Sequence, residues 1–315
     1  MSFLKALLEV FQITAPIFII IAAGFLIRKI KLINDEGVGL LNRLAYNMGL
    51  PALIFLNITN YKLSEIFNID IMKVMYSAYG IYFIILILLS FFIKRSRKTR
   101  GASIVASFRC NMAFVGLPIV WAAYGSLALA RGSLVIAFII PVNIVATVLI
   151  FKFFNRREEK LNIRKLFRSF VTDPMIIAAI LGIIFSYFGL GLPGFIHDSL
   201  DIISGMTVAV ALLSIGASFR FDHLKDDLRM VAYISLNKLI LLPAIVFLVA
   251  TFIYKIDTFD RNVMVILFAT PLAVAAYIMA KELRSNHSLM ASALIFTTII
   301  SALTISGWLL AFKFL

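Results

Sequence analysis

Long apolar stretches separated by short polar connections run through the whole chain. They lie near residues 10–28, 38–58, 71–93, 102–125, 133–154, 173–190, 199–217, 230–254, 261–281 and 289–312, bounded by charged residues, Gly, Pro or Asn. A helix needs about 20 apolar residues to cross roughly 30 Å of hydrocarbon. The pattern therefore predicts an all-α polytopic membrane protein with ten transmembrane helices. The first stretch continues to Arg28 without a small-residue cleavage site, so we expect a membrane span and not a cleaved signal peptide.

Composition and charge support a membrane protein and predict its orientation. With 62% hydrophobic and 15% charged residues, the 315-residue chain has too few polar side chains to cover a soluble surface. The net charge of +14 does not indicate nucleic-acid binding, because the basic residues lie in short gaps between apolar stretches. In the connections after the first, third, fifth, seventh and ninth stretches Lys and Arg number 3, 5, 7, 3 and 2, against five in the other connections. The positive-inside rule places the basic connections in the cytoplasm and both termini outside the cell membrane.

A weak internal repeat divides the chain into two halves. Pro16 and Pro174 each open an apolar run with a glycine eight residues later, at Gly24 and Gly182, which sets a repeat frame of 158 residues. Residues 1–157 and 158–315 would then hold five helices each. Because five is odd, the second half would enter the membrane with the opposite orientation, as an inverted repeat. Chance recurrence of Pro and Gly is the alternative.

The polar residues inside the predicted spans are basic or neutral. None of the sixteen carboxylates falls near the centre of a span, so neither a buried proton relay nor a carboxylate-lined sodium site is expected. A basic and neutral lining favours an anion. The cations could instead extend to the cytoplasmic interface, and isolated asparagines could simply tie helices together. These residues are Arg43, Asn47, Asn57, Arg109, Asn111, Asn143, Asn237 and Lys238.

Two spans contain residues that predict a break at mid-membrane. Thr270-Pro271 lies at the middle of the ninth stretch and has the order of a helix N-cap and first helical residue, so a second half-helix is expected from Pro271. In the fourth stretch Cys110-Asn111 falls near the same point of the repeat frame, and Asn111 would open a half-helix to Tyr124, with Pro118 as a later kink beside this helix break. Two half-helix N-termini would then face one another and bind an anion. A proline kink without a ligand is the alternative.

Five short motifs carry a resemblance to a known family over essentially the whole chain. They are Asn42-Arg43 followed by Leu50-Pro51-Ala52-Leu53, the run from Asn111 to Pro118, Leu213-Ser214-Ile215-Gly216, Lys238 with Pro243, and Thr270-Pro271 followed by Ala280-Lys281-Glu282. In this order and spacing they resemble the auxin efflux carrier family. That family comprises the plant PIN proteins and their bacterial permease relatives, within a wider group that includes the bile-acid sodium symporters.

The resemblance implies a fold, a partner and a mechanism. The fold would be two inverted five-helix repeats with broken fourth and ninth helices. Helices in 10–58 and 173–217 would form a scaffold that dimerises, and helices in 71–154 and 230–312 a mobile block that carries a small organic anion by an elevator movement. Gly205, Ala209, Gly216 and Ala217 offer small residues for a homodimer contact.

Three departures from the family pattern make auxin a poor candidate for the substrate. Leu272 stands where family members often have a polar residue, and Ile54-Phe55 where plant carriers have Ser-Phe. The connection after the fifth stretch is only about 20 residues long and lacks the long insertion of many plant carriers.

The sequence thus predicts a secondary carrier of small carboxylates in the lipid bilayer, with malate, malonate and aromatic acids as open candidates. The predicted substrate-binding residues are Arg109, Asn111, Asn143, Lys238, Thr270 and Pro271. The alternative is a sodium-coupled symporter of the bile-acid type, with Thr270, Thr297 and Thr298 near the ion. An intramembrane enzyme is disfavoured, because no carboxylate pair or nucleophile with a base lies at motif spacing inside a span. One cysteine and three widely spaced histidines predict no disulfide, metal or cofactor.

Overall fold

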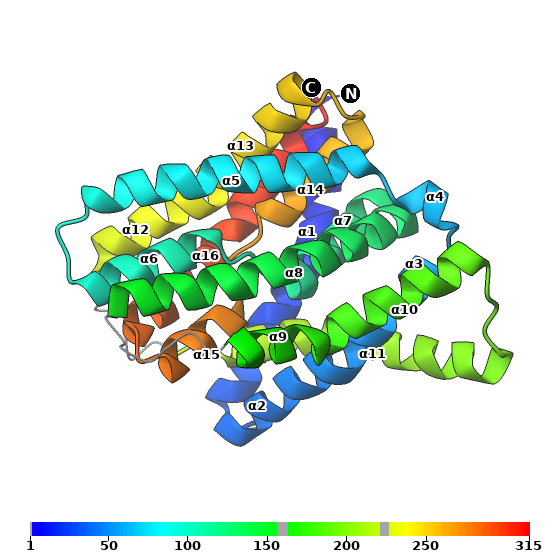
Figure 1. Cartoon of the computed structure of the whole chain (residues 1–315), viewed down its shortest axis with the longest axis horizontal. Helices are drawn as coiled ribbons and strands as arrows, with labels where there is room; N and C mark the ends of the chain where they lie inside the picture. Colours follow the sequence, from blue (N-terminus) through cyan, green and yellow to red (C-terminus); the bar gives the residue numbers. More distant parts are fainter. Residues whose placement is uncertain (1, 156–162, 221–226) are drawn as a thin grey trace.

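A computed structural model describes residues 2–155, 163–220 and 227–315, and most of these residues lie in helices (Figure 1). Six helices within them are long and apolar enough to cross a membrane: α1 (Phe3–Lys29), α5 (Ile69–Phe91), α8 (Ser126–Asn155), α11 (Gly194–Ala217), the segment Leu228–Ile253 and α16 (His287–Ala311). Two shorter apolar helices are Met112–Tyr124 and α10 (Pro174–Phe188). This architecture is that of a polytopic membrane protein.

Three leucine-proline pairs follow a wide turn of π-helix inside otherwise continuous helices. The π turns Ala45–Gly49 (η1), Met112–Gly116 (η2) and Asn237–Leu241 (η4) lead directly into α3 (Leu50–Thr59), α7 (Leu117–Tyr124) and α13 (Leu242–Leu248). Proline has no N–H, and its ring collides with the carbonyl four residues earlier, which a wider turn relieves. Each proline is therefore accommodated inside a helix. The helix thus continues through Pro118, where the sequence predicts a kink after the main break at Asn111.

Two helix breaks meet in the middle of the molecule. Three residues separate the helix α6 (Arg97–Phe108) from η2. Five residues separate α14 (Thr258–Phe268) from α15 (Val274–Glu282). The two gaps pair as a short antiparallel bridge, in which Asn111 N donates to Pro271 O at 2.9 Å and Ala273 N to Arg109 O at 3.0 Å. Irregular backbone inside a membrane needs such partners, because no water is there to satisfy it. We call residues 109–111 and 269–273 the crossing.

The second half-helix does not begin where the sequence predicts. It begins at Val274, three residues after Pro271, and its N-cap is Ala273. The hydroxyl of Thr270 instead donates to Leu267 O at 2.8 Å, at the end of α14. Pairing of the crossing keeps residues 270–273 extended, which a local N-cap signal does not reveal. The sequence also missed two short helices, α4 (Leu63–Ile66) and α9 (Ile163–Val171).

The helices pack in two groups. One holds α1, α2 (Asp35–Leu44), α3, α10 and α11, and the other holds α5 to α8 and α12 (Leu228–Leu236) to α16. Contacts of α8 with α3 and α10, and of α1 with α16 and α7, join the groups. Figure 1 shows the two chain ends side by side, where Lys313 Nζ lies 3.0 Å from a carboxylate oxygen of Glu9.

In the first group α1 and α11 touch backbone to backbone through two glycines. A Cβ atom added to Gly24 would lie 2.1 Å from Leu213 O, and one added to Gly216 would lie 1.8 Å from Ile21 O. No side chain fits at either position, so these glycines set the distance between the two helices.

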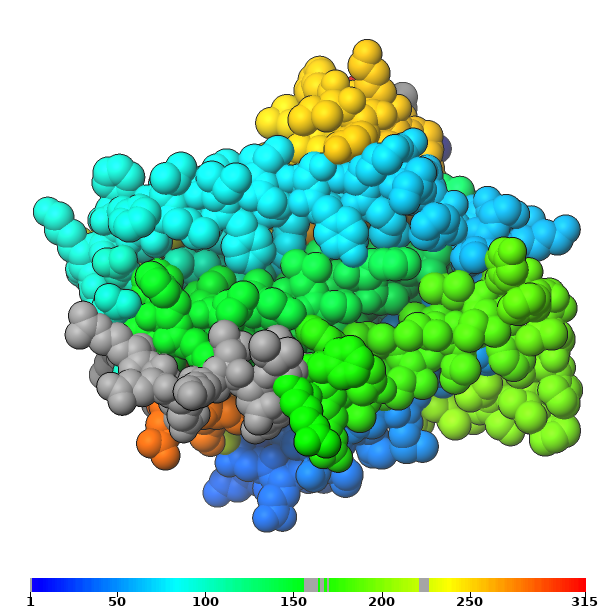
Figure 2. All heavy atoms as spheres, viewed as in Figure 1, coloured from blue at the N-terminus to red at the C-terminus, as the bar shows by residue number. Residues whose placement is uncertain are grey.

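The outer surface is apolar, as a lipid-facing surface must be. Figure 2 shows α5, α8 and α10 running along one face, in cyan, green and light green. Exposed large side chains on α5 and α10 include Ile84, Leu88, Ile180, Ile184 and Tyr187. This surface would aggregate in water, whereas hydrocarbon accommodates it.

Candidate functional site

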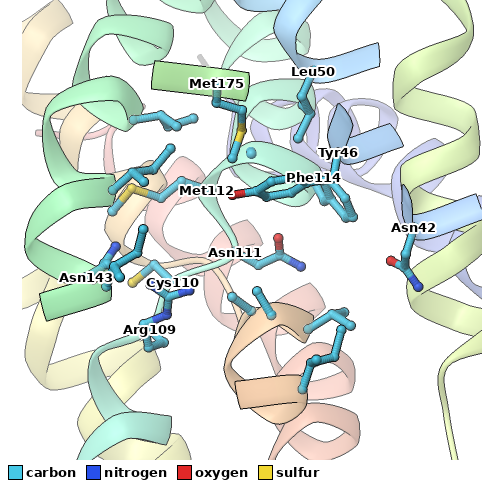
Figure 3. Close-up of a pocket in the computed structure, with 18 of the residues that line it drawn as sticks. Asn42, Tyr46, Leu50, Arg109, Cys110, Asn111, Met112, Phe114, Asn143 and Met175 are labelled. Atoms are coloured by element: carbon cyan, nitrogen blue, oxygen red, sulfur yellow. The ribbon is translucent and has the colours of Figure 1, made fainter. Parts of the chain in front are cut away.

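A cavity of about 480 Å³ lies between the two helix groups, against the crossing (Figure 3). Residues of α2, α3 and α10 line one side, while residues 109–114, α8 and the first turn of α15 line the other. In Figure 3, Asn42 and Tyr46 lie on one side, Arg109, Cys110 and Asn143 on the opposite side, and Asn111 between them. The cavity is thus built where residues far apart in the sequence converge.

Two helix N-termini contribute to the cavity wall. Met112, Ala113 and Phe114 belong to the first turn after Asn111, and Ala273, Val274 and Ala275 surround the start of α15. The first-turn N–H groups of a helix have no acceptor within it, and the helix dipole adds partial positive charge there. Both helix starts therefore favour an anion in the cavity.

Two buried donors of the cavity wall have no partner in the described part of the chain. Arg109 is 9% exposed and Asn111 is 6% exposed, and neither Nε of Arg109 nor Nδ2 of Asn111 has a hydrogen-bond acceptor there. No carboxylate is among the described residues that line the cavity. Because buried polar groups are nearly always hydrogen-bonded, unpaired donors in a cavity wall indicate a ligand that accepts hydrogen bonds.

Asn143 lines the cavity from α8 and is held by a tyrosine of α5. The Tyr79 hydroxyl lies 2.8 Å from Phe108 O and 2.6 Å from the side-chain oxygen of Asn143. A hydroxyl has one proton, so rotating the amide lets Tyr79 donate to Phe108 O while the Asn143 NH₂ donates to Tyr79. Tyr79 thereby supports the end of α6, where a helix leaves carbonyl groups unpaired. No sequence signal marks Tyr79 as part of the site, since tyrosine is common in apolar helices.

The other predicted site residues lie behind the crossing and do not line the cavity. Lys238 is fully buried, with Nζ 3.2 Å from Sγ of Cys110. Thr270 is fully buried as well, and Pro271 contributes its carbonyl to the bridge. Of the six predicted residues, the structure thus brings Arg109, Asn111 and Asn143 together at the cavity, while Lys238, Thr270 and Pro271 support it from behind.

The far wall of the cavity contains polar residues that the sequence did not assign to the site. Asn42, Arg43, Tyr46 and Asn47 all line it. The Tyr46 hydroxyl donates to Asp173 at 2.7 Å, which ties the wall to the start of α10. The sequence contains a signal for this wall. Asn42 and Tyr46, and likewise Arg43 and Asn47, are four residues apart, so the four side chains lie on adjacent parts of one helix face.

Comparison with known proteins gives matches over nearly the whole chain. The family model described as "Membrane transport protein" matches residues 9–309. An uncharacterized transporter of Methanocaldococcus jannaschii is 26% identical over 302 residues, which cover 93% of this chain and 96% of that protein. An uncharacterized transporter of Methanothermobacter thermautotrophicus is 23% identical, with 93% and 95% covered. A protein of Rhizobium meliloti named "Putative malonate transporter" is 19% identical, with 96% and 95% covered.

Proposed function

The chain belongs to the membrane transport protein family, and we propose that it is a secondary carrier of small organic anions that bear a carboxylate. The resemblance to the auxin efflux carriers is confirmed, and the protein is a transporter and not an enzyme. The observation that carries the proposed substrate class is the pair of unpaired buried donors on Arg109 and Asn111 in one cavity.

A carboxylate matches these donors in charge and number. The Arg109 guanidinium supplies a charge-assisted hydrogen bond, the Asn111 amide a neutral one, and the two helix starts supply backbone N–H groups. Ile136, Ile139 and Met175 form an apolar wall that suits a short hydrocarbon. Arg43 lines the same cavity and supports a second carboxylate, as in the malonate named for the Rhizobium relative.

We propose an elevator movement between the two helix groups. The group of α1 to α3, α10 and α11 acts as the scaffold, and the group that holds the crossing moves with the bound anion. The position of the cavity between the groups supports this division. The crossing also supports an inverted repeat of ten helices in halves 1–157 and 158–315, because the helices before it end at Phe108 and Phe268, close to the frame of 158 residues.

We also propose that the scaffold forms a homodimer through α11. Gly205 and Ala209 are exposed on this helix beside Ile202 and Met206. Gly216 faces α1 within the same chain and is taken out of the proposed interface, since a Cβ atom there would meet Ile21 O. Ala217 is fully buried and is excluded as well. The dimer contact is thus confined to the first half of α11.

Uptake into proteoliposomes tests the substrate class and the coupling ion together. We expect the protein to take up labelled malonate or malate at the same rate with and without a sodium gradient. The Thr297 hydroxyl already accepts from Leu272 N and donates to Ala293 O, which leaves little capacity for a sodium ion at the crossing. Asn111→Ala removes one buried donor, and we expect it to weaken apparent affinity about 5- to 10-fold, equivalent to about 1 kcal/mol.

Asn57→Ala is the matched control, because the Asn57 amide donates to Leu53 O within its own helix and does not line the cavity. It should leave uptake unchanged. Uptake that requires sodium would favour the symporter alternative. An unchanged affinity in Asn111→Ala would remove that residue from the proposed site.

Cysteine labelling tests the proposed orientation, with both termini outside. In a Cys110→Ser background, Lys98→Cys at the exposed start of α6 should stay unlabelled by an impermeant thiol reagent added to intact cells. Gly191→Cys, in the exposed connection between α10 and α11, should be labelled at once. The positive-inside rule gives this direction, because the connection around Lys98 is rich in Lys and Arg.

Permeabilised cells provide the control, since both cysteines should then react. Labelling of Lys98→Cys but not of Gly191→Cys in intact cells would reverse the proposed orientation.

A further inference from the structure

The single cysteine of the chain occupies an unusual place. Cys110 sits in the extended segment between α6 and η2, is 8% exposed and lines the cavity. Its Sγ atom lies 3.4 Å from Phe268 O and 3.2 Å from Nζ of Lys238, which reaches it from η4. A thiol therefore stands between the cavity and a buried amine.

Within residues 2–155, 163–220 and 227–315, no carboxylate forms an ion pair with Lys238. Its side chain is fully buried, and among the described residues the only hydrogen-bond partner of Nζ is Cys110 Sγ. Burying an ammonium group without a partner of opposite charge costs free energy, because the group loses its hydration and apolar surroundings offer nothing in return. Transfer of a proton from the thiol to Nζ needs no movement of either residue, because Sγ and Nζ already lie within hydrogen-bond distance.

We propose that Cys110 and Lys238 form a reactive thiol–amine pair, which is a covalent modification site for small electrophiles that bear a carboxylate. A thiolate is the reactive form of cysteine, and a neighbouring lysine promotes it. With iodoacetate, Cys110 Sγ attacks the methylene carbon, a C–S bond forms and the C–I bond breaks. Iodide leaves, and the thiol proton passes to Lys238 Nζ.

Selectivity for an acidic electrophile comes from the neighbours of Cys110. Arg109 precedes it in the chain, and its unpaired guanidinium nitrogen belongs to the same cavity wall. The reagent's carboxylate would take the position that the substrate's carboxylate takes. This part rests on the proposed function, whereas the reactivity of the pair does not.

Mass spectrometry of the intact purified protein tests both parts, because one cysteine gives one adduct. At pH 7 we expect wild-type protein to react with iodoacetamide at least as fast as glutathione does, despite the burial of Cys110. We also compare the ratio of the iodoacetate rate to the iodoacetamide rate. For the protein this ratio should be at least about tenfold higher than for glutathione, equivalent to about 1.4 kcal/mol of carboxylate binding. An ordinary thiol is only a few per cent thiolate at pH 7, so Lys238→Met should slow both reagents about tenfold or more. Lys238→Arg keeps the cation and should keep most of the rate.

Two results would overturn the reactive pair. One is a Lys238→Met protein, monodisperse by gel filtration, that reacts as fast as wild type. The other result needs no variant. Folded wild-type protein would react with iodoacetamide more slowly than glutathione does, and after denaturation in SDS it would react at the glutathione rate.

The carboxylate selectivity has its own readout. Arg109→Gln should abolish the preference for iodoacetate, measured as the ratio of the iodoacetate rate to the iodoacetamide rate of the same protein. Fast alkylation by iodoacetamide without any preference for iodoacetate in wild type would contradict carboxylate binding, and the proposed function with it, while leaving the reactive pair intact.

Discussion

Replacing Arg109 by glutamine is expected to weaken ligand binding strongly without destabilising the protein. A hydrogen bond to a charged group contributes about 1.5–3 kcal/mol, so affinity for a carboxylate should fall about 10- to 150-fold. Stability should stay equal or rise, because the Arg109 side chain is buried and its Nε is unpaired in the described part of the chain. Thermal unfolding with and without malonate measures both quantities. A wild-type protein gains about 2.7 kcal/mol at a ligand concentration of 100 times its Kd, and at the same concentration the variant should gain only about 0.3–1.4 kcal/mol.

Arg131→Gln is the matched control, since it removes a mostly buried arginine that does not line the cavity. Arg131 pairs with Asp260, whose side chain is 1% exposed and also accepts from Asn68 at 3.2 Å. Its loss leaves a buried carboxylate uncompensated, which should cost about 3–5 kcal/mol of stability but leave affinity for the anion unchanged. An Arg109→Gln protein that is destabilised like Arg131→Gln, with normal affinity, would show that Arg109 is structural.

Replacing Gly216 by alanine is expected to prevent α1 and α11 from packing. The added Cβ atom would lie 1.8 Å from the backbone oxygen of Ile21, so a whole helix must shift and no side chain can yield. Overpacking typically costs about 1–3 kcal/mol, and a backbone obstacle places this substitution at or above the upper end. We expect most of the protein to aggregate on extraction. Gel filtration of the detergent-solubilised protein after graded heating measures the loss.

Gly205→Ala provides the control on the same helix. A Cβ atom at Gly205 would meet nothing within 4 Å in the chain, so the monomer fold should be unaffected. If Gly216→Ala behaves like Gly205→Ala, with an unchanged unfolding temperature, then α1 and α11 do not approach as closely as the structure has them.

The helix breaks show how far local sequence signals reach. Asn111 and Thr270-Pro271 marked the crossing correctly to within a few residues, because proline and asparagine act on the backbone where they stand. The start of α15 at Val274 was missed, because it depends on hydrogen bonds to residues 109 and 111, about 160 positions away in the chain. A pattern read along the chain contains no information about such a partner.

The candidate site divides in the same way. Arg109, Asn111 and Lys238 look equivalent in the sequence, as polar residues inside apolar stretches. The structure separates them, because Lys238 Nζ has Cys110 Sγ as a partner, whereas donors on Arg109 and Asn111 remain unpaired at the cavity. Whether a buried donor is free for a ligand depends on every group around it.

The sequence by itself determined that this chain is a helical membrane protein, and where its apolar helices lie. Hydrophobicity acts on each segment separately, because each must match the hydrocarbon that surrounds it. Only the tertiary structure decided that α1 and α11 meet at two glycines, that the two breaks pair with each other, and that a cavity without carboxylates opens beside them. These features arise from contacts between distant segments, where shape and hydrogen-bond partners, and not hydrophobicity, select one arrangement.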